Sequence, residues 1–379
     1  MEFIGFETCI KAKENEYHLK TASDIQQNQL NSVMIKNGMV QTVNESIRID
    51  DTVEADIKQK VRQVHDERVE IIYLLLEFSQ NMPLSVDNAV WRDRLGMGFF
   101  NSGMYEEAIG EFQKAVDRDP LYSQALNHLG EAHFNSGDCR RAIEYLELAV
   151  KQKPDFADFH LDLAEAYLKV GRCDDSYNSA ERALIINSFY GRAYYLRALA
   201  LLMQTVYLDY TEPNEELTQR IQNDISSAVS IDSSLKSGGY ETAWQHLENG
   251  DYKDALAILE SNAKMPGSQK FSTAKLKTYI KLAMSLDKLS YDEVFDYIAY
   301  LEEKLDKNPQ FADLHYELGA AHSILGNIFA SRASKYYKRA LEVNPDYSKA
   351  RSNLNISENL DQGTESLLKT ILNSRDVGC

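Results

Sequence analysis

Apolar and small residues recur with two spacings along residues 89–188. Within each helix-length stretch they lie three or four positions apart, which places their side chains on one face of an α-helix. The whole set returns every 34 residues and is present in three copies. The copies are Leu95, Gly96, Phe99, Gly103, Ala108, Phe112, Ala115 and Pro120; Leu129, Gly130, His133, Gly137, Ala142, Leu146, Ala149 and Pro154; and Leu163, Ala164, Tyr167, Gly171, Ser176, Ala180, Ala183 and Ser188. This period predicts helix–turn–helix units that stack on copies of themselves.

The residues between the two predicted helices of each unit favour a turn. Gly103, Gly137 and Gly171 stand where the first helix must end, and glycine adopts without steric cost the left-handed conformation that ends many helices. Pro120 and Pro154 close their units, because proline has no N–H and cannot continue a helix. One unit cannot bury its apolar face alone, so we expect its neighbours to cover it.

Weaker copies of the pattern extend to most of the chain, and the last copy is clear again. It reads Leu318, Gly319, His322, Gly326, Ala333, Tyr337, Ala340 and Pro345, with two extra residues between Gly326 and Ala333. His133 and His322 occupy the same apolar position of their units, so we expect both to pack in the core. The expected division is an irregular N-terminal arm at 1–50, a capping helix at 51–82, clear repeats at 89–122, 123–156 and 157–190, a fourth unit with an acidic insertion at 191–235, a fifth at 236–269, a degenerate sixth at 270–311, a seventh at 312–347 and C-terminal capping helices at 348–379.

Two segments leave alternatives open. Residues 1–50 show no repeat, and residues 31–49 have a composition that suits short extended segments. The arm either packs on the helices or pairs with a partner, or it is a mobile leader. The acidic insertion near 208–216 is either a contact site or tolerated variation in a surface loop.

The signature positions of the three clear copies closely resemble those of the tetratricopeptide repeat. The resemblance is specific, because spacing and residue type agree over the whole of 89–188. It implies an all-α protein, a right-handed α-solenoid of about seven repeats. It also implies a concave groove that binds a peptide or an amphipathic helix of a partner protein.

The resemblance places the groove on the first helix of each repeat, on the face turned away from the second helix. The corresponding residues are Asp93, Met97, Phe100 and Asn101 in the first repeat; Asn127, Glu131, Phe134 and Asn135 in the second; Asp158, Leu161, Glu165, Leu168 and Lys169 in the third; and Arg192, Tyr195, Leu199, Leu202 and Met203 in the fourth.

Phe100 and Asn101 return one period later as Phe134 and Asn135. An aromatic ring beside an amide suits an extended peptide, because the ring buries a side chain and the amide pairs with the backbone. In the other interpretation, both rings pack between neighbouring helices.

Some members of the family hold a C-terminal carboxylate with lysine and asparagine. The matching positions here are Asp93, Met97, Asn127 and Glu131, so that clamp is absent. The mixture is apolar and acidic, which predicts an amphipathic partner segment that is basic or neutral.

The charge balance narrows the classes of partner. The chain has 58 acidic and 41 basic residues and a formal net charge of −17. This argues against nucleic-acid binding, which needs clustered lysine and arginine. The acidity either suits a basic partner or serves solubility alone.

Cysteine use and apolar runs bear on the compartment. Cys139 and Cys173 lie 34 residues apart, at one position of successive repeats, and we expect reduced thiols in a cytoplasmic protein. Residues 71–76 form the longest strongly apolar run, which is too short for membrane insertion. Glu2 and Glu7 argue against a secretory signal at the N-terminus.

The sequence contains no motif of catalysis or cofactor binding. A nucleotide-binding glycine loop, an HExxH pair, a GxSxG elbow and a CxxC pair are all absent. We therefore expect no catalytic residues, no metal and no cofactor. The predicted function is a non-enzymatic scaffold or adaptor that binds other proteins.

Three further interpretations stay open. One is an assembly or maturation chaperone for a multisubunit complex, which would hold its client in the same groove. Another is an enzyme whose site is built at the arm or the acidic insertion. A second copy of the chain is also a candidate partner, because exposed apolar ends of a solenoid invite self-association.

Overall fold

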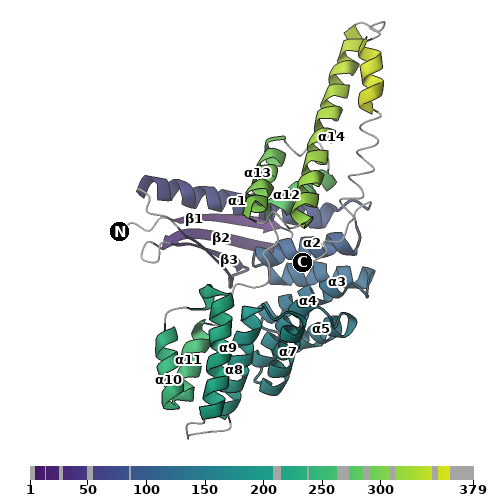
Figure 1. Ribbon diagram of the computed structural model, residues 1–379. Helices are drawn as coiled ribbons and strands as arrows, with labels where there is room; N and C mark the ends of the chain where they lie inside the picture. Colours follow the sequence, from purple (N-terminus) through teal and green to yellow (C-terminus); the bar gives the residue numbers. More distant parts are fainter. Residues whose placement is uncertain are drawn as a thin grey trace. The chain divides into compact units, whose positions relative to one another are not determined.

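The computed structural model describes residues 5–12, 14–24, 29–48, 54–84, 87–207, 215–236, 239–262, 273–284, 291–307, 312–343 and 349–358 (Figure 1). The chain divides into two compact units. Unit 1 comprises Met1–Met104 and Phe271–Cys379, and unit 2 comprises Tyr105–Lys270.

Unit 2 is built from consecutive helices that pack against their sequence neighbours. They are α3 (Tyr105–Arg118), α4 (Ser123–Asn135), α5 (Cys139–Gln152), α6 (Ala157–Lys169), α7 (Cys173–Ile186), α8 (Gly191–Tyr207), α9 (Glu215–Ile231), the short 3-10 helix η1 (Ser233–Leu235), α10 (Tyr240–Asn249) and α11 (Tyr252–Asn262). This is the helix–turn–helix packing of an α-solenoid that the 34-residue period predicts.

The turn between the helices of a unit has the same geometry in successive repeats. Gly137 and Gly171 have φ values of 91° and 76°, in the left-handed region that favours glycine. The N–H of Asp138 donates to the carbonyl of His133, and that of Arg172 donates to the carbonyl of Tyr167, both at 2.9 Å. These bonds satisfy carbonyls that the helix end leaves without partners. The predicted role of the turn glycines is therefore confirmed.

Close helix packing explains the glycine at the middle of α4. A Cβ added at Gly130 would lie 2.6 Å from Cγ of Leu146 and 3.1 Å from the carbonyl oxygen of Ala142, both on α5. Since these distances are below ordinary contact, only glycine lets α4 and α5 approach this closely. A buried core of Ala164, Ala180, Leu196, Ile225 and their neighbours continues from α6 to α11.

Unit 1 begins with a four-stranded antiparallel sheet in the order β1-β2-β3-β4. The strands are β1 (Gly5–Ala12), β2 (Asn15–Asp24), β3 (Gln29–Lys36) and β4 (Met39–Arg48). Asn37 and Gly38 join β3 to β4 with positive φ at both positions, as a tight hairpin with matching twist requires. Within unit 1 the sheet lies along α1 (Glu54–Asn81), as Figure 1 shows.

The expectation of an irregular arm at 1–50, and its interpretation as a mobile leader, are therefore wrong for the described residues. The short extended segments expected in 31–49 are β3 and β4. The buried face of the sheet contains hydroxyl side chains as well as apolar ones. The alternation of apolar and polar residues that marks a strand is therefore weak in the sequence. His65 of α1 makes hydrogen bonds with Thr8 at 2.8 Å and Thr21 at 3.1 Å, and Thr21 also pairs with Ser32 at 2.9 Å.

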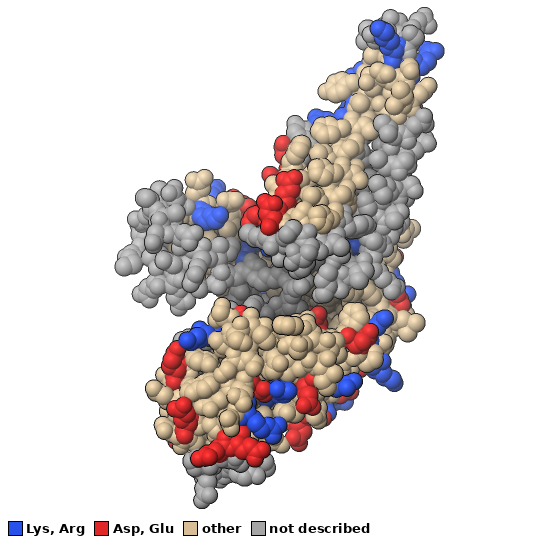
Figure 2. All heavy atoms as spheres, in the orientation of Figure 1, with Lys and Arg blue, Asp and Glu red and all other residues tan. Residues whose placement is uncertain are grey.

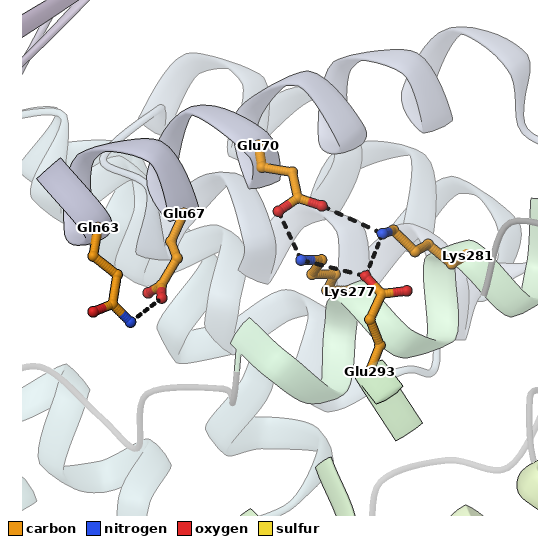
Figure 3. Close-up of polar contacts among 6 residues, drawn as sticks. All are labelled: Gln63, Glu67, Glu70, Lys277, Lys281 and Glu293. Atoms are coloured by element: carbon orange, nitrogen blue, oxygen red, sulfur yellow. Dashed lines mark hydrogen bonds and ion pairs between the residues drawn. The ribbon is translucent and has the colours of Figure 1, made fainter. Parts of the chain in front are cut away.

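The remaining helices of unit 1 are α2 (Ala89–Asn101), α12 (Thr273–Met284), α13 (Tyr291–Lys307) and α14 (Ala312–Val343), and residues 349–358 are also helical. Ion pairs connect α1 with α12 and α13, although more than 200 residues separate them in the sequence (Figure 3). Glu70 of α1 lies 2.7 Å from Nζ of Lys277 and 3.3 Å from Nζ of Lys281. Glu293 of α13 contacts the same two lysines, at 3.5 and 2.5 Å.

The predicted turn of the seventh unit, 312–347, does not form. Residues 312–343 make one continuous helix, α14, and Gly326 lies inside it instead of ending it. The physical reason is that apolar residues continue in helical register after Gly326, of which Ile328 is buried, and that Gly326 does not adopt the left-handed conformation.

Several expectations fall outside the described residues or are limited to part of them. The predicted acidic insertion lies almost entirely in 208–214, and the last predicted C-terminal capping helix lies in 359–379, both outside the described residues.

Cys9, Cys139 and Cys173 are free thiols. Among the described helices, none combines the length and apolar character that crossing a bilayer requires.

Candidate functional site

The candidate site in unit 2 is the face formed by the first helices of three successive repeats, α4, α6 and α8. We call it the first-helix face. Helix α6 contacts both α4 and α8, so side chains from the three helices can meet there. Asp93, Met97, Phe100 and Asn101 of the first repeat belong to α2 in unit 1, where the first two are buried and the last two half-buried.

A polar ladder of Asn127, Glu131, Asp162, Glu165 and Arg192 runs across the first-helix face. Nδ2 of Asn127 donates to Oδ2 of Asp162 at 2.8 Å, so α4 is bonded to α6. Nη1 of Arg192 lies 3.8 Å from Oδ1 of Asp162, and Nη2 of Arg192 pairs with Glu165. The ladder therefore joins three repeats through polar contacts.

The ladder is acidic and largely removed from water. It holds the three carboxylates of Glu131, Asp162 and Glu165 against the one guanidinium of Arg192. Burial raises the pKa of the Asp162 carboxyl, while Arg192, Asn127 and Glu131 act in the opposite direction. Desolvation is the larger influence, so the buried site favours the protonated form of Asp162.

The acceptor Oδ1 of Asn127 and the donor Nε of Arg192 are buried without a hydrogen-bond partner among the described residues. Asn127 as a whole is only 4 % exposed. A buried donor or acceptor that stays unsatisfied costs about 1–3 kcal/mol.

The exposed part of the face lies beside the ladder. Asp158, Asn135 and Lys169 are exposed, and Phe134 is half-buried. Tyr190 bonds to Asp158, and Nδ2 of Asn135 donates to the carbonyl of Glu131 at 2.9 Å.

Seven predicted groove residues belong to the packing between helices: Tyr195, Leu161, Phe134, Leu168, Leu199, Leu202 and Met203. Tyr195 is 1 % exposed, and its hydroxyl donates to the carbonyl of Leu259 at 2.9 Å, so it has no surface for a partner. Leu161 lies in the core that continues to α11. Phe134 packs against the cluster of Ile143, Leu146 and Tyr167, as the interpretation of helix packing expected.

Sequence reasoning missed Asp162, which is central to the ladder. The resemblance placed Leu161 on the face, and Asp162 is the next residue. One signal was available in the sequence. Asp162 lies one period after His128, at a position that recurs in each repeat, and a carboxylate beside a buried asparagine needs a hydrogen-bond partner.

Comparisons with known proteins agree with the repeat geometry. Two family profiles, both described as tetratricopeptide repeat, match residues 94–157 and 136–202. No curated protein matches the chain.

Solved structures similar to this one include a crystal structure of MamA, with 22 % identity, a TM-score of 0.37, and 48 % of this chain and 97 % of that chain covered. Another is TTC0263, a thermophilic TPR protein of Thermus thermophilus, with 18 % identity, a TM-score of 0.34, and 62 % and 98 % covered. A third is the first TPR of Spaghetti (RPAP3) bound to an HSP90 peptide, with 19 % identity, a TM-score of 0.27, and 40 % and 99 % covered.

The period, the left-handed turn glycines, the close approach at Gly130 and the family profiles agree: the chain contains tetratricopeptide repeats, which the profiles place at residues 94–202.

Proposed function

We propose that the chain is a non-enzymatic protein-interaction scaffold that binds a partner segment on the first-helix face of α4, α6 and α8. Tetratricopeptide repeats are in general protein-interaction modules. The observation that carries the proposal is the acidic ladder, in which three carboxylates face one guanidinium, together with the exposed Asp158 beside it.

The partner segment is basic or neutral and amphipathic. Its positive side chains face the carboxylates of the ladder, and its apolar side chains lie against the half-buried Phe134. Figure 2 shows Asp and Glu interspersed with Lys and Arg on the visible face of unit 2. Such a mixture suits a protein partner better than nucleic acid, which needs clustered cations. A cytoplasmic location forms part of the proposal and accords with the free thiols.

The test is a random peptide library selected against the full chain. We expect the selected peptides to combine Lys or Arg with apolar residues and to bind more weakly as the salt concentration rises. Asp158→Lys and Glu165→Gln remove negative charge from the face and should each weaken binding roughly tenfold, equivalent to about 1.4 kcal/mol.

Glu144→Lys is the matched control. Glu144 is exposed on the second helix α5, where it pairs with Arg140 at 3.3 Å, so this variant changes the charge of unit 2 away from the first-helix face. Equal affinity in the two face variants and the wild type, or a loss confined to the control, would contradict the proposal. Circular dichroism and thermal melting verify that all three variants fold.

A further inference from the structure

The β1–β2 hairpin has one face that α1 does not cover. The pairing register places Glu7 opposite Lys20, Cys9 opposite His18, and Lys11 opposite Glu16. Successive side chains of a strand point to opposite faces of a sheet. Because Thr8 and Thr21 point to His65 of α1, these six residues lie together on the other face. Glu7, Cys9 and Glu16 are exposed, and His18 is half-buried.

Three different metal-ligating groups meet at the centre of this face. Sγ of Cys9 donates to Oε1 of Glu16 at 3.0 Å, and Nε2 of His18 lies 3.5 Å from the same oxygen. One ligand atom from each of Cys9, Glu16 and His18 lies within 4.8 Å of the others. Among the described residues, no second group of three such side chains comes this close.

The donor set fits a borderline divalent cation. Zinc binds thiolate sulfur at about 2.3 Å and imidazole nitrogen or carboxylate oxygen at about 2.0–2.2 Å, usually with four ligands. Three donors from adjacent strands need only small rotamer changes to converge on one ion. Magnesium and calcium prefer oxygen ligands alone, so a thiol and an imidazole argue against them.

A neighbouring carboxylate orients the histidine. Nδ1 of His18 lies 3.2 Å from Oε1 of Glu7, and an N–H donated there leaves the lone pair of Nε2 directed at Glu16. Ligating histidines in metal sites commonly donate their other ring nitrogen to a carboxylate in this way. Lys11 and Lys20 approach the same carboxylates, at 3.9 Å from Glu16 and 3.2 Å from Glu7. Their charges compete with a cation, so we expect a site of moderate affinity.

We propose that Cys9, Glu16 and His18 form a binding site for a zinc-type divalent cation, with Glu7 as the residue that orients His18. The Cys9 thiol releases its proton to solvent when the metal–sulfur bond forms, and the fourth coordination position is left to water or to a ligand from a partner.

The test uses the full chain, reduced and treated with a chelator. Titration with Co²⁺ should produce the absorption of a thiolate–cobalt bond, and Zn²⁺ should displace it, with one metal bound per chain. Cys9→Ser and His18→Gln should weaken binding at least tenfold. Cys139→Ser and His246→Gln are matched controls elsewhere in the chain, and they should bind like the wild type. Absence of the thiolate–cobalt band, or its survival in Cys9→Ser, would overturn the proposal.

A second measurement needs no variant. Zn²⁺ should slow the reaction of Cys9 with iodoacetamide at least tenfold, because a metal-bound thiolate is shielded, and it should leave the labelling of Cys139 unchanged. Equal rates of Cys9 labelling with and without Zn²⁺ would refute the site even if a variant failed to fold.

Discussion

Helices α4 and α5 and the single helix α14 carry the same signature residues but form different structures. In the first region, Gly137 turns the chain with φ of 91°, and His133 is 5 % exposed and stacks on Tyr145 with ring centroids 5.5 Å apart. In α14, Gly326 lies within the helix, and His322 is exposed, contrary to the expectation that it packs in the core.

The comparison shows that a signature residue acquires its role only when the chain reverses. Asp138 follows Gly137 directly and caps α5, because its carboxylate accepts the N–H of Arg141 at 3.1 Å. The reversal then carries Leu146 against Gly130. After Gly326 the helix continues, and the described helix that returns, 349–358, contacts Tyr337 and Lys338 and does not reach Gly319. Gly319 and His322, which match Gly130 and His133, therefore have no counterpart of α5 to pack against.

The largest contrast is expected at the packing glycines. Gly130→Ala should destabilise the protein by about 1–3 kcal/mol, because the added Cβ meets Leu146 at 2.6 Å. Gly319→Ala should stabilise it by about 0.5–1 kcal/mol, since alanine is the better helix former and nothing lies within 4 Å. Urea unfolding followed by circular dichroism measures both. Effects of the same sign would remove the distinction between the two regions.

A smaller contrast is expected at the turn glycines. Gly137→Ala forces a Cβ into the left-handed conformation and should cost about 1–2 kcal/mol, although space is available around it. Gly326 has no positive φ and no neighbour within 4 Å of its Cβ position, so Gly326→Ala should be neutral or stabilising. Hydrogen exchange of the flanking amides, compared between the two variants, reports the change locally. Faster exchange of the amides around residue 326 would indicate that the chain turns there, which would contradict a continuous α14.

The smallest difference between the two regions is expected in the pH dependence of stability. Burial lowers the pKa of His133; Asp138 and Glu144 raise it, and Arg141 lowers it. The unfolded chain therefore binds more protons near the ordinary histidine pKa of about 6.5, and stability falls as pH falls through that value. The loss levels off below the folded pKa.

His133→Phe should reduce this loss, and His322→Phe, which replaces an exposed histidine, serves as the comparison. His65 has a pKa that burial also lowers, and it contributes equally in both variants. The measurement is the difference in urea midpoint between pH 8 and pH 5. Identical pH dependence in His133→Phe and the wild type would mean that His133 is solvated.

The sequence predicted what depends on the 34-residue period and missed what depends on pairing between distant segments. The hairpins of 123–186 follow from signature spacing alone. The N-terminal sheet was missed because Thr8, Thr21 and Ser32 occupy core-facing positions, although Asn37–Gly38 was an available hairpin signal.

The candidate site was predicted in part for the same reason. Asn127 and Glu131 follow from the matching positions of the repeat, and they lie in the ladder. Asp162 requires knowledge of which residue of α6 faces Asn127, and Tyr195 requires knowledge that the core continues to α11. Cys9 and His18 become neighbours only through the strand register.

The ladder also sets a limit on how this array can be altered by recombination. Asp162 belongs to one module, its amide partner Asn127 to the preceding one and its counter-charge Arg192 to the following one. Transplanting the middle module alone would leave a desolvated acid without either partner, and deleting it would leave Asn127 and Arg192 without that acid. In recombination or engineering, these three modules therefore need to be moved together.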